Sequence, residues 1–317
     1  MNPLLGRLHA YPFERLRALT RDIVPNAAYR PISLGIGEPR HPAPALVEQA
    51  LCDSLAGLSS YPATAGEPAL REAIAGWVTR RYGVELNAAT QVLPVNGSRE
   101  ALFSLAQTVI DASRPGATVV CPNPFYQIYE GAALLGGADT AFANSDPARN
   151  FACNWGQIDD ATWARTQLLY VCSPGNPTGA VMPLAEWKTL FELSDKHGFV
   201  IASDECYSEI YFRDEPPLGS LEAAQALTYK AVDAYNDEKY VKKTMLSMET
   251  TKLVSMAKAY VGDVNAEIMD QCVQFHGGMG YLEDLWVARA WRDARLLRIG
   301  GGATEVMRYT TAKIMGL

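Results

Sequence analysis

Residues 200–212 read VIASDECYSEIYF, a short apolar run that ends in an acid and leads into two tyrosines. The run has the composition of a strand that is buried on both faces, as in a parallel sheet. Asp204 follows directly, and Tyr207 comes three positions later. Burying a carboxylate at the end of a strand costs free energy unless solvent or a bound group satisfies it. The segment therefore predicts a parallel sheet with a polar site at its edge.

Similar strand-like runs precede this one, and helical stretches separate them. The runs are QVLPV at 91–95, ATVVC at 117–121, QLLYVC at 167–172 and FVIAS at 199–203. Apolar residues at helical spacing occupy 98–110 and 183–197. This alternation predicts an α/β sheet with right-handed crossovers. Because Pro94 cannot donate to a ladder, we expect the strand at 91–95 to lie at an edge or to begin irregularly.

The pattern changes after residue 224. From 225 to 275 there is neither a strand pattern nor a proline. One face of a long helix is predicted by apolar residues at three- and four-residue steps, namely Leu253, Met256, Tyr260, Val264, Ile268 and Cys272. We therefore expect two regions, an α/β region over 1–224 and an all-α bundle fragment over 225–317.

Two glycine-rich turns divide the rest of the bundle fragment. HGGMGY at 276–281 and GGG at 300–302 flank a second helical pattern. Thr304 is the expected N-cap of the last helix, with Glu305 close behind.

The overall composition excludes several classes of protein. The chain has 317 residues, with 48% hydrophobic and 20% charged residues, which is ordinary for a globular protein. A net charge of −7 without a basic stripe argues against a nucleic-acid partner. No apolar run reaches the roughly 20 residues that span a bilayer, and the N-terminus does not read as a secretory signal. The six cysteines lack paired spacing, so we expect free thiols, no metal site and a cytoplasmic location.

Loops after the predicted strands carry residues suited to a flat, anionic ligand. Gly97 and Ser98 stand where a strand passes into a helix, and the free N–H groups there can bind a phosphate or merely begin the helix. Tyr126 can lay its ring against a flat cofactor or belong to the core. Two prolines and two glycines in SPGNPTG (173–179) can fix the backbone so that Asn176 projects its amide at a ligand. Parallel sheets bind ligands at this edge.

The segment after the last strand completes this predicted site. Asp204 can pair with a protonated pyridine nitrogen and keep the ring an electron sink, unless it is simply solvated. Tyr207 can hydrogen-bond the phenolic oxygen of the same ring. Together the clusters predict a site for pyridoxal 5′-phosphate.

Over residues 1–224 these motifs resemble the class I and II, fold-type I, pyridoxal-phosphate-dependent aminotransferases. LGIGEP (34–39) and YPATAGEPALREAI (61–74) add to the likeness. The resemblance implies that Gly37 lies in a loop that closes over the substrate. It also implies a homodimer in which Tyr61 reaches the phosphate of the neighbouring subunit. The sheet is then the three-layer α/β/α domain of these enzymes, here incomplete.

Several segments, among them VLPVNGSREALF and CPNPFYQIYEGAALL, resemble the succinyldiaminopimelate transaminase branch in particular. That likeness implies amino transfer between a diaminopimelate-type amino acid and the 2-oxo acid 2-oxoglutarate, in lysine biosynthesis.

The resemblance also implies a Schiff-base lysine in a strand after Asp204, yet the chain leaves the family pattern at GSLEAAQALTYKAV. Lys242 and Lys243 fall at a suitable distance along the chain, within a stretch that reads as an exposed helix. The catalytic lysine therefore stays unknown, and we expect impaired transaminase activity. The family's last strands would also lie beyond 224, which leaves the strand at 91–95 without its neighbour.

Residues 225–317 resemble the C-terminal end of acyl-CoA dehydrogenases through QFHGGMGY and RIGGGATE. The resemblance implies that Gln274, Gly277 and Gly278 approach FAD of a partner subunit, and that Thr304 and Glu305 lie near it. Gly301 occupies the position of the catalytic glutamate of many members, so this segment is not expected to be a dehydrogenase in isolation. Two alternatives to an aminotransferase remain. One is a fragment of an acyl-CoA dehydrogenase-like FAD protein, which is a CH–CH oxidoreductase. The other is a non-catalytic chimera that binds pyridoxal phosphate.

Overall fold

The computed structural model describes residues 1–30, 32, 37, 41–242, 244–275, 290–292, 295, 298–299 and 303–315. At its centre lies a five-stranded sheet in the order β3-β2-β1-β4-β5. The strands are β1 Thr118–Asn123, β2 Asp139–Asp146, β3 Ala152–Cys153, β4 Thr166–Cys172 and β5 Val200–Asp204. β1, β2, β4 and β5 run parallel, and the short β3 pairs antiparallel with β2 at one edge.

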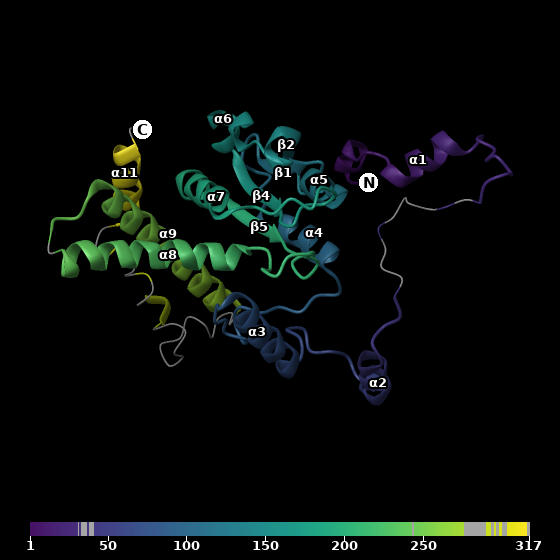
Figure 1. Cartoon of the computed structure of the whole chain (residues 1–317), viewed down its shortest axis with the longest axis horizontal. Coiled ribbons are helices and arrows are strands. Elements are labelled where there is room, and N and C mark those ends of the chain that lie inside the picture. Colours follow the sequence, from purple (N-terminus) through teal and green to yellow (C-terminus); the bar gives the residue numbers. More distant parts are fainter. Residues whose placement is uncertain are drawn as a thin grey trace.

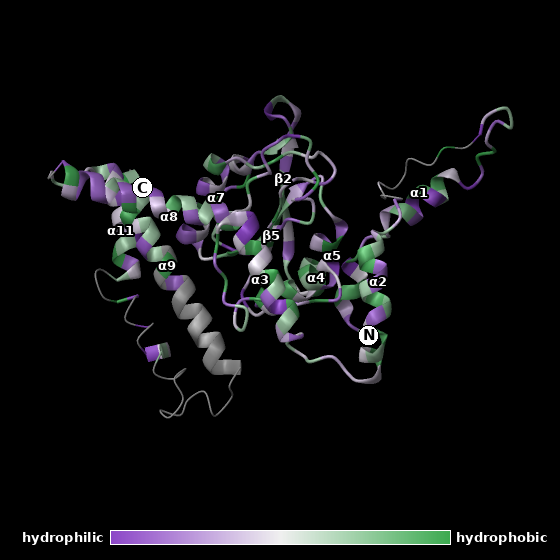
Figure 2. Cartoon of the chain, turned by 60° about the horizontal axis from the view of Figure 1, so that its bottom comes forward, coloured by the Kyte–Doolittle hydropathy of each residue, from purple (hydrophilic) through white to green (hydrophobic). Residues whose placement is uncertain are grey.

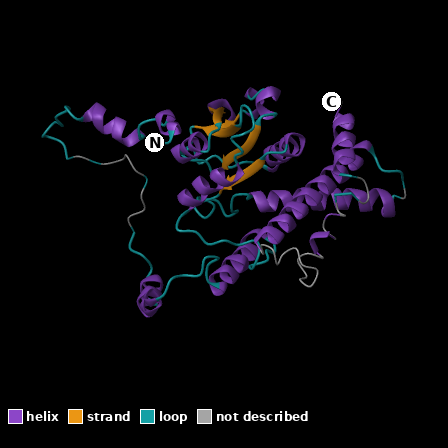
Figure 3. Ribbon diagram, turned by 180° about the vertical axis from the view of Figure 1, so that it is seen from behind, coloured by secondary structure: helices purple, strands orange, loops and turns teal. Residues whose placement is uncertain are grey.

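Helices cover both faces of the sheet (Figures 1 and 3). They include α4 Ser98–Val109, α5 Gln127–Leu135, α6 Asp160–Trp163, α7 Leu184–His197 and α8 Ser220–Asn236, with the short turns η3 Pro147–Arg149 and η4 Trp155–Gln157. Val119 and Leu168 belong to the core cluster with residues of α4 and α5. Val120 and Leu169 belong to the other cluster, with residues of α7 and α8. Because neighbouring strand residues face opposite ways, one apolar run supplies both cores, which gives a three-layer α/β/α domain.

Three of the four predicted strands are confirmed. The runs at 117–121, 167–172 and 199–203 become β1, β4 and β5 within one residue or two. The prediction for 91–95 is wrong, because that stretch forms no strand and leaves Leu93 68% exposed. Pro94 lacks a ladder donor, and β3 and β5 form the edges of the described sheet, so no strand pairs with this stretch.

The C-terminal region is helical, as predicted. Its helices are α9 Met248–Phe275 and α11 Thr304–Met315, and the turn η5 Asp237–Val241 connects α8 to α9. Leu253, Met256 and Ala259 are buried on one face of α9. The expected division at 224/225 falls inside the continuous helix α8.

Two expectations for the end of the chain need comment. The turn HGGMGY and most of the helical pattern after it lie outside the described residues. The last helix, α11, begins at Thr304, where the sequence predicts its start. The expected capping hydrogen bond is not formed, because the Oγ1 of Thr304 has no hydrogen-bond partner among the described residues.

The N-terminal segment leads away from the sheet (Figure 1). It contains η1 Pro3–Arg7, α1 Pro12–Thr20, α2 Ala45–Asp53, η2 Leu55–Ser59 and α3 Pro68–Tyr82. Helices α1 and α2 bury no residue, although α2 is largely hydrophobic (Figure 2). Helix α3 is anchored by Arg81, whose Nε donates to Glu209 at 2.6 Å. Of the helices in the described part of the chain, none is long and apolar enough to cross a membrane.

Candidate pyridoxal-phosphate site

The carboxylate of Asp204 is the centre of the candidate site. Asp204 closes β5 with only 7% of its surface exposed, so it is not a solvated surface acid. Its Oδ2 accepts a hydrogen bond from the Tyr129 hydroxyl at 2.6 Å, and its Oδ1 accepts one from the Cys206 N–H at 3.3 Å. A carboxylate has about four acceptor positions. The oriented acid can therefore accept a further donor, such as a protonated ring nitrogen.

Tyr129 is a candidate site residue that the sequence analysis did not single out. It lies on α5, is fully buried, and stacks on Tyr170 of β4 with the ring centroids 4.4 Å apart. Burial, and then its hydrogen bond to Asp204, raise the pKa of Tyr129, so the hydroxyl remains a donor. The Tyr170 hydroxyl donates in turn to the Leu102 carbonyl on α4 at 2.6 Å. The signal available in the sequence was the spacing of Tyr129 three residues after Tyr126, on the same side of a helix.

Tyr126 connects this acid to the start of α4. It is the N-cap residue of α5, and its ring meets Tyr129 edge-on with the centroids 5.9 Å apart. Its hydroxyl accepts a hydrogen bond from Arg99 Nε at 2.9 Å, and this bond raises the pKa of Arg99. The aromatic side chain predicted to contact a flat cofactor therefore lies between the buried acid and the N-terminus of α4.

The backbone around Gly97 has a conformation that favours glycine. Gly97 has φ 127° and ψ 143°, and Ser98 is the first residue of α4. The first N–H groups of a helix have no intrahelical acceptor and attract anions. The exposed carboxylate of Glu100 approaches the same point, since a Cβ built on Gly97 would lie 2.6 Å from its Oε2. A phosphate bound here would have to displace that flexible side chain.

The loops after β4 and β5 adjoin this edge. Ser173, at the start of the loop that carries Asn176, donates its N–H to the Asp204 carbonyl at 3.2 Å. Asn176 lines a small cavity of about 50 Å³ on that loop. Tyr207 is half-buried in the turn after β5, and burial, followed by the charge of Cys206, raises its pKa. Cys172 lies at the end of β4, where burial and then the charge of Asp204 raise its pKa to about 11.

Other predicted site residues lie elsewhere. Tyr61 is 101% exposed, so its ring is not packed against the described part of the chain. Gly37 is exposed, with open space around the position of a Cβ. Lys242 is exposed directly after η5 and pairs with Asp237 at 2.6 Å, while Lys243 lies outside the described residues.

No described lysine lies on the loops that follow β1, β4 or β5. The described lysines occur from α7 onward, on helices or directly after η5, as Lys188, Lys196, Lys230, Lys239, Lys242, Lys252, Lys258 and Lys313. Besides Lys242, ion pairs join Lys188 to Glu192, Lys196 to Asp160 and Lys252 to Glu249.

The residues implied by the second resemblance are only partly described. Gln274 belongs to α9, but its side chain, Gly277 and Gly278 lie outside what the structure describes. Thr304 is buried with 1% of its surface exposed, whereas Glu305 is exposed in the first turn of α11.

The chain belongs to the aminotransferase class I and II family, whose model matches residues 29–261. Residues 219–316 also match the acyl-CoA dehydrogenase C-terminal domain, so the two matches share 219–261. Both resemblances expected from the motifs are thereby confirmed.

Individual relatives agree with the family assignment. LL-diaminopimelate aminotransferase of Dehalococcoides mccartyi is 35% identical over 194 residues, which cover 61% of this chain and 49% of that protein. The putative aminotransferase AatC of Rhizobium meliloti is 34% identical over 225 residues, covering 69% and 54%. The chain spans about half the length of these curated relatives.

Solved structures show the same fold. An aminotransferase from Neisseria meningitidis is 51% identical, with a TM-score of 0.69, over 72% of this chain and 58% of that one. The aminotransferase AspB from Helicobacter pylori is 28% identical, with a TM-score of 0.66, over 96% and 76%.

Proposed function

We propose that this chain binds pyridoxal 5′-phosphate at the sheet edge and has the chemistry of an aminotransferase, with an amino acid and a 2-oxo acid as substrates. The observation that carries the proposal is the buried Asp204 carboxylate, which Tyr129 holds at 2.6 Å beside the start of α4. The donor set suits the cofactor: an oriented acid with free acceptor positions, an aromatic ring at Tyr126, and a glycine cradle at Gly97.

Each residue has a definite task in this proposal. Asp204 accepts a hydrogen bond from the ring nitrogen and keeps it protonated, while Tyr129 fixes the carboxylate. Tyr126 stacks against the ring, and the N–H groups at Gly97 and Ser98 bind the phosphate. Asn176 and Tyr207 hydrogen-bond the phenolic oxygen. When bound, the cofactor supplies an electron sink for bonds to the substrate's α-carbon.

We propose that turnover is weak or absent, because the described residues supply no amine at the sheet edge. In an aminotransferase a lysine anchors the cofactor and moves the α-proton. Lys242 is held in a surface ion pair instead. Lys242 and Lys243 are the candidates that an active enzyme would have to use.

The proposed amino donor is a diaminopimelate-type amino acid, with 2-oxoglutarate as acceptor, in lysine biosynthesis in the cytoplasm. Support comes from relatives named LL-diaminopimelate aminotransferase and from the motifs shared with the succinyldiaminopimelate branch. The finer choice of a succinylated substrate rests on those motifs alone.

We propose a homodimer as the working form. Tyr61 is fully exposed among the described residues, which suits a residue that reaches a neighbouring subunit. Leu46 and Leu58 are 81% and 82% exposed on the N-terminal segment, and such side chains gain stability when a partner covers them.

A second candidate, a flavin protein of acyl-CoA dehydrogenase type, is supported by the match over 219–316. Of the residues implied to lie near FAD, Thr304 is enclosed by the helices while Glu305 is exposed. The described residues therefore do not form a single surface that could bind a flavin. We propose that residues 1–224 bind the cofactor and that residues 225–317 have a structural role. A yellow purified protein would favour the flavin candidate.

Titration with pyridoxal phosphate, followed by absorbance, tests the proposed site. Asp204→Asn keeps the size of the side chain but removes the charge, so it is expected to weaken binding by about ten-fold or more. Asp214→Asn changes an exposed acid after β5 and serves as the matched control. Equal affinity of wild type and Asp204→Asn would refute the proposed role of Asp204.

A further inference from the structure

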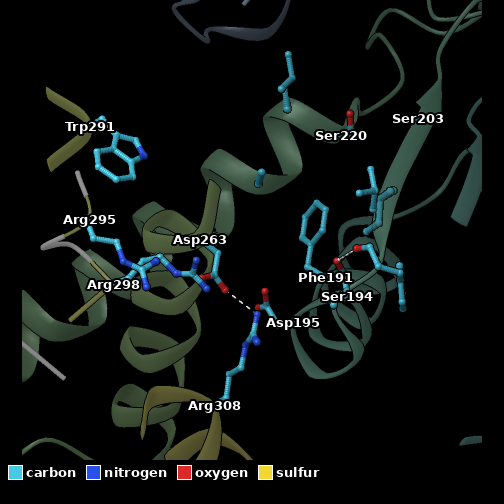
Figure 4. Close-up of a pocket in the computed structure, with 16 residues that line it drawn as sticks. Phe191, Ser194, Asp195, Ser203, Ser220, Asp263, Trp291, Arg295, Arg298 and Arg308 are labelled. Carbon is cyan, nitrogen blue, oxygen red and sulfur yellow. Dashed lines mark hydrogen bonds and ion pairs between the residues drawn. The ribbon is translucent and has the colours of Figure 1, made fainter. Parts of the chain in front are cut away.

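A large cleft separates the sheet layer from the C-terminal helices. Its volume is about 790 Å³, and it lies between α7, β5 and α8 on one side and the C-terminal helices on the other (Figure 4). Its charged lining consists of Asp195, Asp263, Arg295, Arg298 and Arg308.

This cleft is separate from the candidate cofactor site. Ser203 lines the cleft, whereas its neighbour Asp204 contacts Tyr129 of α5. Successive residues of a strand face opposite sides of the sheet, so β5 lies between the two sites. A ligand in one site does not contact the residues of the other.

The charges in the cleft leave positive groups in excess. The single carboxylate of Asp263 pairs with two arginines, Arg298 at 2.8 Å and Arg308 at 2.6 Å. The Nε of Arg308 is buried and has no hydrogen-bond acceptor within the described part of the chain. The exposed side chain of Arg295 also lines the cleft, and it pairs with no described acid. A buried donor without an acceptor is uncommon in native proteins and retains unused hydrogen-bonding capacity.

The remaining walls favour an apolar ligand body. Ile201 and Leu221 contribute apolar surface, and the almost fully buried Phe191 and Phe199 add little. The hydroxyls of Ser203 and Ser220 donate to Glu205 Oε1, at 2.8 and 2.7 Å, so their protons are already used. The hydrogen-bond donors of the cleft that can still bind a ligand are therefore those of its arginines.

We propose that this cleft binds a small organic anion, with one carboxylate or phosphate group at Arg295 and Arg308 and an apolar body against Ile201 and Leu221. Guanidinium groups bind both oxyanions through charge-assisted hydrogen bonds. The volume lies within the range of about 300–1,000 Å³ that is typical of sites for small molecules. The ligand would contact α7 and β5 as well as the C-terminal helices, so binding would also join the two regions of the chain.

Asp195 makes this binding sensitive to pH. Burial raises its pKa to about 7, the negative charges of Asp263 on α9 and Glu192 on α7 act in the same direction, and Arg308 on α11 opposes them. Above pH 7 the ionised Asp195 repels an anion beside Arg308, and below pH 7 it does not. Affinity for the anion therefore falls as pH rises through 7.

Calorimetric titration of the full chain tests the proposal, with benzoate and phenyl phosphate as probes and benzyl alcohol as the uncharged control. Arg295→Ala is expected to weaken binding of the acid probes by about ten-fold, the effect of losing one charge-assisted contact. Arg17→Ala removes an exposed arginine of α1 and is expected to change nothing. Asp195→Asn is expected to tighten binding several-fold at pH 8 and to abolish the pH dependence of benzoate binding.

Binding of either acid probe with these dependences supports the proposal, and the probe that binds more tightly identifies the group, carboxylate or phosphate. The proposal is overturned if neither acid binds, if benzyl alcohol binds equally well, or if Arg295→Ala leaves the affinity unchanged. Because Arg295 is exposed, its replacement should leave the fold intact, and an unchanged melting temperature in the absence of ligand would verify this.

Discussion

At the end of β5, the buried Asp204 depends on the hydroxyl of Tyr129. Tyr129→Phe removes that donor and leaves Oδ2 without its protein partner. We expect a loss of about 1–3 kcal/mol in the free energy of unfolding and weaker binding of pyridoxal phosphate. Denaturant unfolding and cofactor titration measure the two effects. Tyr126→Phe, which loses only the exposed contact with Arg99, is the control and should change stability by less than about 0.5 kcal/mol. If the two variants behave alike, Tyr129 does not position Asp204.

At the start of α4, the conformation of Gly97 predicts a second effect. With φ at 127°, Gly97→Ala is strained and should cost about 1–3 kcal/mol, apart from any effect on phosphate binding. Gly131→Ala is the matched control, since Gly131 lies within α5 and has open space around its Cβ position. There alanine should be neutral or stabilise by up to about 1 kcal/mol. Thermal melting of both variants gives the comparison, and a fully stable Gly97→Ala would show that this backbone is not constrained.

At the scale of elements, the N-terminal segment predicts a change in assembly. Leu46→Ser combined with Leu58→Ser removes two side chains that the single chain leaves exposed. If they pack against a second copy, the dimer dissociation constant should rise by at least about ten-fold while the fold of the monomer persists. Analytical ultracentrifugation measures this. Val232→Ser, on the half-exposed side of α8, is the control, and a wild type that is already monomeric would contradict the dimer.

The strands show which elements the sequence could predict. β1, β4 and β5 are apolar runs, so a local pattern was sufficient. β2 was not predicted, because Asp139, Thr140 and Asn144 make its sequence look like a loop, and only its pairing with β1 makes it a strand. The stretch at 91–95 has strand-like composition, but the described sheet offers no neighbouring strand for it, so the local pattern predicted a strand that does not form.

In the candidate site, too, local features could be predicted from the sequence, whereas contacts between distant residues could not. Asp204 could be predicted because its position at the end of a strand is a local property. The Tyr129 contact joins residues 75 positions apart and exists only once α5 packs on the sheet. Similarly, Lys242 could be doubted from its surroundings in the sequence, but its ion pair with Asp237 required the turn η5.

At the scale of the whole molecule, the contact between the two regions should depend on pH. The folded pKa of Asp195 is about 7, above the value of about 4 that an aspartate has in an unfolded chain. A raised carboxyl pKa means that the folded state binds the proton more tightly. The stabilisation of the folded state by the proton on Asp195 is therefore fully present below pH 4 and is lost as pH rises from 4 to 7.

Asp195→Asn should remove the loss of stability that ionisation of Asp195 causes at higher pH. Its melting temperature should exceed that of the wild type by about 2–4 °C for each kcal/mol recovered at pH 8, with little difference at pH 4. Thermal melts at both pH values give the comparison, with Asp214→Asn as an exposed control. An equal difference at the two pH values would mean that Asp195 does not titrate near 7.

The central proposal is that the chain binds pyridoxal phosphate at the end of β5, and that none of the described lysines lies where it could hold the cofactor covalently. Borohydride reduction of the cofactor-loaded protein, followed by peptide mass mapping of wild type and Asp204→Asn, tests it most directly. We predict that wild type binds the cofactor, which a change in absorbance would detect, and that after reduction no lysine carries an adduct that depends on Asp204. An adduct on Lys242, Lys243 or another lysine in the wild type that disappears in Asp204→Asn would contradict the account.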